Sequence, residues 1–447
     1  MRPPPRRRLA HALVALAIAL VAALAHDARA DAPIRLWHAY RGDEERALTE
    51  ILAAWKGAPV EVLAVPYDAL GSKLAASIPL GQGPDLFIDA HERLGDFRAR
   101  GLVAPVGDAF VERDAFLPQA VAAVSEDGVA WAVPLSQKCV ALYVNVALAP
   151  RWQSEPTLDD IAKSRSVLPD GTFVIAWENS AYAQAGLFAA YGAHLLGPND
   201  QFGLVGPGAD AAARMARELV DRRVVPEDAD GALVTSLFKS GRAAFAISGP
   251  WLAAEIGPSS DALRYYVTEL PVVGRPNAGR MHPLMTFESV MLSPRGAARA
   301  DVRALARRLA DRAAAETRVE IAHALTVRVD VEYSADPILV GFRREAEYAE
   351  PMPSRVAMRA VWEPANRAIR KVLRHDAEPE VAFEEAKRQF DDVRRPLPPR
   401  ASPVPALFAV GLLGLAAAIA LVRRAQRGGF AEVKRSLPAY AYVAHAV

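Results

Sequence analysis

The chain has 447 residues, more than one hydrophobic core usually organises, so we expect two lobes or domains together with appended segments. Its 53 basic and 52 acidic residues nearly balance, which argues against a basic surface for nucleic acid or another polyanion. The single cysteine, Cys139, excludes an intramolecular disulfide and any site built from several cysteines, and we expect it to be a buried apolar residue. We therefore expect neither redox chemistry nor a cofactor.

The first thirty residues have the features of an export signal. Arginines at position 2 and positions 6 to 8 precede an apolar run from Leu9 to Ala25, which ends near Ala28-Arg29-Ala30. We expect a signal peptide over residues 1–30, cleaved after Ala30. The alternative is a retained membrane helix, which the interrupting His11 and the small-x-small site disfavour. No cysteine follows for a lipid anchor.

Residues 31–392 alternate short apolar runs with amphipathic stretches, a pattern that predicts an α/β architecture. Between the first two runs, DEERALTEILAAW is expected to form a helix with Ala47, Leu48, Ile51, Leu52 and Trp55 on one face. The runs that we expect to be strands are, in chain order, IRLWH (34–38), VEVLAV (60–65), DLFIDA (85–90), VALYVN (140–145), FVIAW (173–177) and AAFAIS (243–248).

The residues that follow these runs are candidate binding residues, because ligands of open α/β sheets lie beyond the carboxyl ends of the strands. Glu92 and Arg93 follow DLFIDA and place a carboxylate acceptor beside a guanidinium fork, a combination suited to sugar hydroxyls. The alternative is a solvated ion pair in a loop. Glu178 follows FVIAW, together with Asn179 and Tyr182.

Two tryptophans add candidate stacking surfaces. Trp251 follows AAFAIS on a turn formed by Gly249 and Pro250, and Trp362 is a further candidate. Pyranose rings present apolar C–H faces between hydroxyl edges, so aromatic plates flanked by carboxylates and amides suit a carbohydrate. The alternative for either tryptophan is a place in the core.

A membrane segment is expected near the C-terminus. A Pro- and Arg-rich linker, residues 393–405, leads into an apolar run over 406–422 that is followed by Arg423-Arg424. About twenty apolar residues cross a bilayer core of about 30 Å, and nothing charged interrupts this run. We expect a transmembrane helix in the inner membrane, with the preceding domain in the periplasm and residues 423–447 in the cytoplasm. A buried soluble helix is the alternative.

Several segments resemble, in the same order, the maltose/maltodextrin-binding branch of the family 1 extracellular solute-binding proteins, over nearly all of residues 33–392. The similar segments are GQGPDLFIDAHERLGDFRARGLVAPV, AVPLSQKCVALYVN, FKSGRAAFAISGPW and EYAEPMPSRVAMRAVWEPANRAIRKVL. The resemblance implies a two-lobed, type II-like periplasmic binding protein fold whose hinge lets the lobes close over a sugar. It also implies that the chain serves an ABC importer and has permease subunits as partners.

The same resemblance assigns roles to the candidate residues. Glu92 and Arg93 would bond to sugar hydroxyls, Tyr182 and Trp251 would contact a sugar ring, and Trp362 would stack on it. Near Tyr182, either Glu178 or Ser180 occupies the acidic position of the family.

The sequence departs from the family pattern at three places. Asp89 stands where a stacking Trp is expected, and Lys138 stands where an acid is expected. In the first loop, Tyr40 and Arg41, with Asp43 and Glu44, replace a polar pair. These departures put maltose in doubt and leave open another disaccharide, a modified sugar, or a charged sugar that meets Arg41 and Lys138.

The last residues, GGFAEVKRSLPAYAYVAHAV, resemble the lead-in and first membrane helix of the partner sugar permeases. This resemblance implies a binding protein fused to the start of its permease, and an ordinary basic juxtamembrane tail is the alternative.

Two other classes of function remain as alternatives. A membrane-anchored carbohydrate-active enzyme could use paired carboxylates such as Glu92 and Glu178, but the chain has no HExxH, GxSxG, Walker or GxGxxG motif. A sensor ectodomain would need a signalling module after the membrane helix. We expect a binding protein and not an enzyme.

Overall fold

The computed structural model of the protein describes residues 32–149, 155–257, 259–260, 262–332, 336–395 and 404–433. The expected signal peptide and residues 434–447 of the expected tail lie outside the described residues. The chain divides into two units, residues 1–394 and 395–447, and each is treated separately below.

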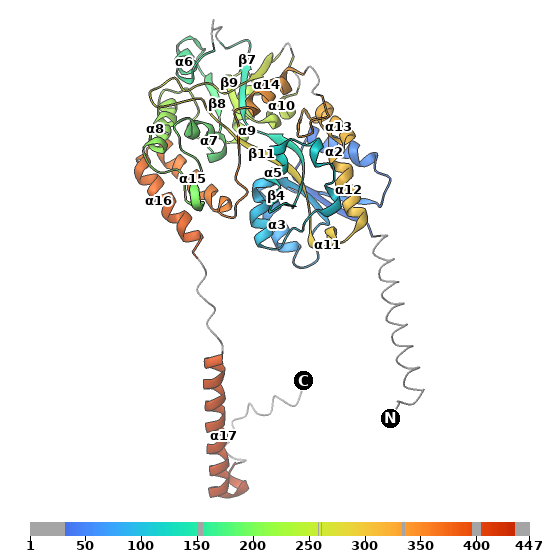
Figure 1. Ribbon diagram of the computed structural model, residues 1–447. Helices are drawn as coiled ribbons and strands as arrows, with labels where there is room; N and C mark the ends of the chain where they lie inside the picture. Colours follow the sequence, from blue (N-terminus) through green and yellow to red (C-terminus); the bar gives the residue numbers. More distant parts are fainter. Residues whose placement is uncertain are drawn as a thin grey trace. The chain divides into compact units, whose positions relative to one another are not determined.

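A seven-stranded mixed sheet forms the first lobe of the first unit (Figure 1). Its strand order is β12-β6-β11-β3-β1-β2, and β13 pairs with β11. Strand β1 runs parallel to both β2 and β3, whereas β11 runs antiparallel to β3 and β6. The strands are β1 (Ile34–His38), β2 (Val60–Ala64), β3 (Leu86–Ala90), β6 (Val133–Lys138), β11 (Leu284–Leu292), β12 (Leu325–Thr326) and β13 (Glu350–Pro351). Its helices are α2 (Asp43–Ala53), α3 (Tyr67–Ser77), α4 (Leu94–Ala99), α5 (Pro118–Ala123), α11 (Pro294–Ala297), α12 (Ala300–Ala310) and α13 (Arg312–Ala322).

A four-stranded sheet with the order β10-β7-β9-β8 forms the second lobe. Its strands are β7 (Ala141–Asn145), β8 (Phe173–Trp177), β9 (Ala243–Ser248) and β10 (Tyr265–Thr268). Its helices are α6 (Leu158–Lys163), α7 (Ala181–Ala190), α8 (Pro207–Asp221), α9 (Gly231–Lys239), α10 (Pro250–Ile256), α14 (Pro337–Ala346), α15 (Met358–Leu373) and α16 (Pro379–Val393). The remaining short elements are the hairpin of β4 (Ser125–Glu126) with β5 (Val129–Ala130), and the 3-10 helices η1 (His91–Arg93), η2 (Gly107–Ala109), η3 (Arg113–Ala115), η4 (Ser164–Val167) and η5 (Pro198–Asp200).

The chain passes between the two lobes several times, including at the following places. Cys139 and Val140 join β6 of the first lobe to β7 of the second. Strand β11 brings the chain back into the first sheet, and the connection from β12 to α14 leads out again. The expected two-lobed α/β fold with a hinge is confirmed, and each lobe is built from separate stretches of sequence. Cys139 is fully buried at the first crossing, as the composition led us to expect.

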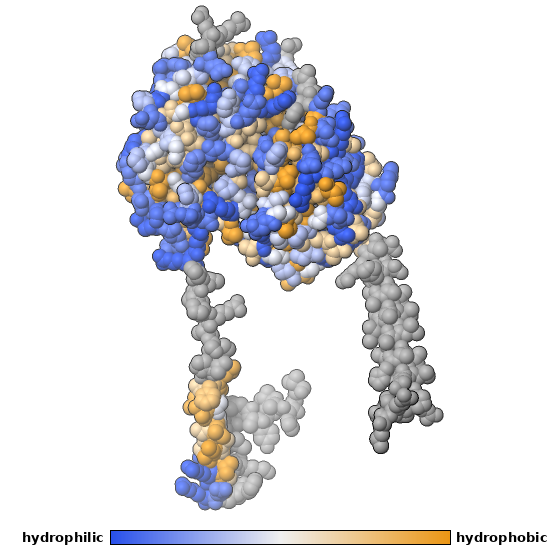
Figure 2. Space-filling model, viewed as in Figure 1, coloured by the Kyte–Doolittle hydropathy of each residue, from blue (hydrophilic) through white to orange (hydrophobic). Residues whose placement is uncertain are grey.

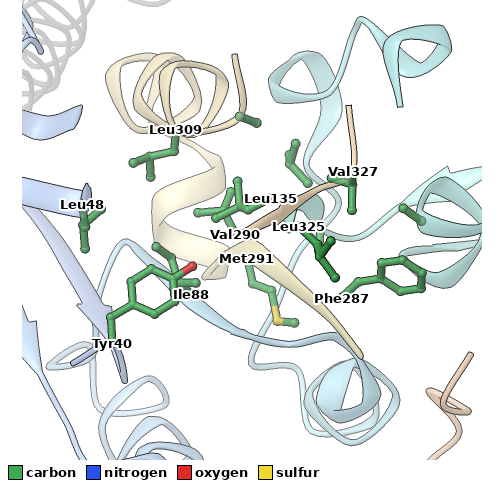
Figure 3. Packing of buried hydrophobic residues seen from close by; sticks show 14 of the residues in the cluster. Tyr40, Leu48, Ile88, Leu135, Phe287, Val290, Met291, Leu309, Leu325 and Val327 are labelled. Atoms are coloured by element: carbon green, nitrogen blue, oxygen red, sulfur yellow. The ribbon is translucent and has the colours of Figure 1, made fainter. Parts of the chain in front are cut away.

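The buried hydrophobic residues form two large clusters. The first fills the first lobe and continues onto one face of the second sheet, where it includes Tyr143 and Ala246, and the second covers the other face of that sheet. Figure 3 shows part of the first, where Leu135 of β6 and Val290 of β11 pack with Leu309 of α12. All nine residues of β11 are buried, which is typical of a central strand covered on both faces. The second core gathers around large buried side chains such as Trp177 and Phe188.

The expected strands form at nearly the predicted residues, and IRLWH, FVIAW and AAFAIS match β1, β8 and β9 residue for residue. The expected helix over DEERALTEILAAW ends at Ala53, so Trp55 lies beyond it and donates from Nε1 to the Ala58 carbonyl at 2.9 Å. Strand β2 lies at the edge of the sheet, and this position leaves Val62 46% exposed.

The second unit contains the helix α17 (Val404–Val433). Its segment Leu407–Arg427 is long and apolar enough to cross a membrane, by length and composition. The helix continues beyond residue 422, where we expected the membrane segment to end. Figure 2 shows hydrophobic residues along this helix and hydrophilic ones near one end.

Candidate functional site

The first wall of the candidate site is built where β3 ends and η1 begins. Asp89 lies in β3 and is 2% exposed; its two carboxylate oxygens accept from the Ala90 amide at 2.8 Å and from Arg93 Nη1 at 3.2 Å. Burial raises the pKa of Asp89 to about 6, although the charge of Arg93 acts against this rise. Asp89 is therefore an internal anchor for the Arg93 guanidinium.

Glu92 is a buried carboxyl group with one oxygen unsatisfied. Its Oε1 accepts from the Tyr67 hydroxyl at 3.1 Å, and its buried Oε2 has no hydrogen-bond partner among the described residues. Burial raises the pKa of Glu92 to about 7, and the neighbouring charge of Asp89 adds to the rise. A solvated loop ion pair, the alternative considered from the sequence, does not describe this environment.

Tyr67 is a residue of this wall that the sequence analysis missed. It begins α3, directly after β2, and the Arg93 guanidinium carbon lies 4.0 Å from the centre of its ring. The rule that led to Glu92, inspection of the residues that follow each strand, would also have found Tyr67.

His91 fixes this wall to the rest of the molecule. Its Nε2 lies 2.9 Å from the Met352 carbonyl oxygen, and its Nδ1 lies 3.0 Å from the Phe287 amide nitrogen. The amide must donate and the carbonyl must accept, so the ring is neutral with its proton on Nε2. Burial lowers the pKa of His91 to about 4, which is consistent with a neutral ring.

Lys138, at the end of β6, is held in two ion pairs. Its Nζ lies 2.6 Å from Glu44 Oε1 and 3.2 Å from Glu288 Oε1. Burial opposes the charge of Lys138, but the two carboxylates outweigh it and raise its pKa. The Lys138 ammonium also lies 5.5 Å from the centre of the ring of Tyr40, which is 6% exposed and part of the first core. Arg41 is exposed on the turn before α2.

The second wall is built where β8 ends and α7 begins. Ser180 is the N-cap of α7 and accepts from the Ala183 amide at 3.2 Å, so its hydroxyl is already engaged. Burial raises the pKa of Glu178, with further contributions from the charges of Asp230 and of Asp68 on α3. Glu178 is also hydrogen-bonded to the Ser180 side chain, which acts against the rise in pKa. The two residues are therefore neighbours, and which of them takes the acidic position stays a prediction.

Two of the three aromatic candidates, Tyr182 and Trp251, lie together in the second lobe. The ring centres of Tyr182 and Trp251 are 6.2 Å apart with an interplanar angle of 43°, and Trp251 is in the first turn of α10. Burial raises the pKa of Tyr182, and its hydrogen bond to Thr286 of β11 acts against this rise. Trp362, on α15, is partly buried against the second core.

The two walls meet at Tyr182 of the second lobe, which is hydrogen-bonded to Thr286 of β11 in the first sheet. Two cations of this region are paired with carboxylates, Arg93 with Asp89 and Lys138 with Glu44 and Glu288, whereas Arg41 is exposed. Carboxyl groups flanked by aromatic rings suit a ligand with many hydroxyl donors and apolar ring faces. Among the described residues, no cluster of three or more His, Cys, Asp or Glu side chains is arranged to hold a metal ion.

Proteins of known structure share this fold. The maltotriose binding protein of Thermus thermophilus, bound with maltotriose, is 22% identical, with a TM-score of 0.72 over 80% of this chain and 99% of that one. The maltose-maltodextrin binding protein of Alicyclobacillus acidocaldarius is 23% identical, with a TM-score of 0.71 over 80% of this chain and 100% of that one.

The sequence also matches characterised relatives and a family model. The maltotriose-binding protein of Pyrococcus abyssi is 26% identical over 370 residues, covering 76% of this chain and 77% of the relative. The galactooligosaccharide-binding protein of Bacillus subtilis is 23% identical over 348 residues, covering 73% of this chain and 81% of the relative. The model of the bacterial extracellular solute-binding protein family matches residues 41–270, half of the chain, and the chain belongs to this family.

Proposed function

We propose that this protein is the extracytoplasmic substrate-binding component of a carbohydrate ABC importer, and that it captures a malto-oligosaccharide-like sugar between its two lobes. The observation that carries the proposal is the buried Glu92 carboxyl group beside Tyr67, whose Oε2 has no hydrogen-bond partner among the described residues, in a member of this family. The relatives are named for binding maltotriose and galactooligosaccharide, which supports an oligosaccharide as the ligand.

The charges of the site favour a neutral sugar. Lys138, which the sequence offered as a partner for a charged sugar, is neutralised by Glu44 and Glu288. The Arg93 guanidinium is likewise paired with Asp89. A sugar carboxylate or phosphate would meet the carboxyl groups of Glu92 and Glu178, whereas neutral hydroxyls can donate to them.

In this proposal, the hinge and the C-terminal helix both serve delivery of the sugar to the importer. Closure of the lobes signals the loaded state to the permease subunits, and α17 anchors the protein in the inner membrane with its first unit in the periplasm. An anchor keeps the binding protein at a high effective concentration near the importer. The permease-like tail is part of the same proposal, as the start of a fused permease subunit.

The two other classes of function receive less support. A carbohydrate-active enzyme that uses Glu92 and Glu178, or a sensor ectodomain, is compatible with a sugar site, but both named relatives are binding proteins. We therefore propose that this protein binds its sugar without cleaving it.

The test is a thermal shift measurement on the full-length protein in detergent micelles. The probes are maltotriose, a galacto-oligosaccharide, cellotriose and, as an anionic sugar, glucuronic acid. A ligand that binds only the folded state at about 100 times its Kd stabilises that state by about 2.7 kcal/mol, so we expect a higher Tm with maltotriose and none with glucuronic acid. No shift with any neutral oligosaccharide would overturn the proposal, and release of glucose from maltotriose would show an enzyme.

A pair of tryptophan variants separates the site from the rest of the fold. Trp251→Ala removes a ring that contacts Tyr182 and is expected to abolish most of the maltotriose shift. Trp55→Ala is the control, because Trp55 is also partly buried but packs against the first core beyond α2. We expect its Tm to fall while the maltotriose shift remains.

A further inference from the structure

Tyr67 is held as a rigid plate on the wall of the first lobe. Its hydroxyl donates to Glu92 Oε1 at 3.1 Å, and the Arg93 guanidinium carbon lies 4.0 Å from the centre of its ring. A tyrosine side chain has two rotatable torsions, so one contact at the ring face and one at its tip fix its position.

Part of the Tyr67 side chain remains exposed. Tyr67 is 42% exposed even though the Arg93 guanidinium covers one face of its ring. Helix α3 begins directly after β2, at the carboxyl end of the parallel strands β1, β2 and β3. Tyr182 of the second lobe is hydrogen-bonded to Thr286 of β11 in the same sheet. The uncovered part of the ring therefore lies beside the space between the lobes.

Asp89 explains why the guanidinium stays over this ring. Arg93 Nη1 donates to Asp89 Oδ2 at 3.2 Å and to the Tyr67 carbonyl oxygen at 3.4 Å. Gly71, one turn along α3, lies beside the guanidinium, since a Cβ there would be in ordinary van der Waals contact with Nη1 at 3.5 Å. Asp89 cannot itself present a surface to a ligand, since it is 2% exposed. Asp89 thus holds Arg93, and Arg93 holds the Tyr67 ring. An aromatic ring from α3 is available at the site although residue 89 is not aromatic.

We propose that Tyr67 stacks against a pyranose ring and is a specificity-determining residue of the site, an inference that rests on the proposed carbohydrate binding. The C–H groups on one face of a pyranose pack on the ring, and the hydroxyls at its edge reach Glu92 and Arg93. Tyr182 and Trp251 of the second lobe contribute the opposing aromatic surface.

The test compares two substitutions that preserve bulk. Tyr67→Phe keeps the plate and removes the hydroxyl, whereas Tyr67→Leu keeps apolar volume and removes the plate. Binding of maltotriose to the full-length protein in detergent micelles is measured by isothermal titration calorimetry, and the Tm of each variant is recorded without sugar. We expect Tyr67→Leu to weaken binding about tenfold and Tyr67→Phe only about twofold to threefold.

Tyr348 provides a matched control. It is 38% exposed and the Arg280 guanidinium carbon lies 4.5 Å from the centre of its ring, but it follows α14 and is bonded through its carbonyl to His282. Tyr348→Leu is expected to leave the affinity unchanged. Equal weakening by both leucine variants, or wild-type affinity of Tyr67→Leu, overturns the role of Tyr67 and leaves the proposed function standing. Failure of the wild type to bind any neutral sugar overturns both.

Discussion

The fold buries the Glu92 carboxyl group in an environment that disfavours its ionised form. It is 7% exposed, and the charge of Asp89 adds to the effect of burial. With a pKa of about 7, it is divided between its protonated and ionised forms at neutral pH. A sugar hydroxyl can donate to the ionised form and accept from the protonated one, so the group suits a hydroxyl-rich ligand in either state.

The raised pKa of Glu92 makes a prediction for stability. A carboxyl group with a higher pKa in the folded state binds protons more tightly when folded, so its stabilising contribution is present at low pH and is lost as the pH rises. For Glu92 this loss runs from the ordinary value of 4.5 to about 7. Glu92→Gln imitates the protonated form, so we expect it to match the wild type near pH 5. At pH 8 its free energy of unfolding should exceed that of the wild type by at most roughly 3 kcal/mol.

Thermal and denaturant unfolding of the full-length wild type and variant at pH 5 and pH 8 measure this difference. Glu363→Gln, on the exposed face of α15, is the control and should stay within about 0.5 kcal/mol of the wild type at both values. A Glu92→Gln difference that does not change with pH would show that burial does not raise the pKa of Glu92.

At the scale of elements, α4 of the first lobe makes backbone contact with the segment that leads into α15. A Cβ at Gly95 would lie 2.0 Å from the Ser354 carbonyl oxygen and 3.0 Å from the Val356 amide nitrogen. The Arg359 to Asp96 ion pair at 3.2 Å, and the bond from His91 to the Met352 carbonyl, lie beside this contact. The position therefore requires a glycine because backbone atoms, which cannot rotate away, surround it.

Gly95→Ala is predicted to destabilise the folded protein by about 1–3 kcal/mol, because α4 and the segment before α15 must move apart. Gly71→Ala is the comparison, since Gly71 also lies in a helix of the first lobe and its Cβ would meet only the Arg93 side chain at 3.5 Å. An alanine there should stabilise α3 by about 0.5–1 kcal/mol through its helix propensity. Urea unfolding of both variants measures the contrast, and equal stability would mean that the contact at Gly95 relaxes without cost.

The strands differ in how far the sequence predicts them. Runs such as FVIAW and AAFAIS are continuously apolar and short, and they form β8 and β9 at the predicted residues. The central strand β11 was not predicted, because Thr286, Glu288 and Ser289 interrupt its apolar pattern. Glu288 tolerates burial because it pairs with Lys138, which lies far away in the sequence. A local pattern cannot reveal a partner of this kind.

Local sequence patterns also predict only part of the candidate site. Glu92, Arg93, Glu178 and Tyr182 were predicted from their positions after strands, and in the structure they follow β3 and β8. The anchoring of Arg93 by Asp89, and the pairing of Lys138 with two acids, depend on contacts that only the folded chain creates. These pairings are what favour a neutral ligand over the charged one that the sequence left open.

At the scale of the whole molecule, each lobe is assembled from separate stretches of chain. The first sheet contains β1 to β3 and β6 from the first part of the sequence, but its central strand β11 is added only after the second sheet is complete. The two facing walls therefore exist only in the assembled first unit. The helix α17 belongs to the second unit.

This separation predicts that anchoring and sugar binding can be changed independently. We expect the full-length protein, produced in a bacterial host, to remain in the membrane pellet after a carbonate wash. Leu415→Arg combined with Ile419→Arg places two charges near the middle of Leu407–Arg427, each at a cost of about 2.5–3.5 kcal/mol in the bilayer. This double variant should move to the soluble fraction and keep wild-type affinity for maltotriose.

The matched control places the same two charges on the first unit. Val167→Arg combined with Val381→Arg changes residues that are 71% and 60% exposed, so this variant should stay in the pellet. If the α17 double variant also stays in the pellet, the protein is held at the membrane by another part of the chain or by a partner. If it is released but loses affinity for maltotriose, α17 contributes to the binding unit, and the division of the chain into an anchor and a separate sugar-binding unit is wrong.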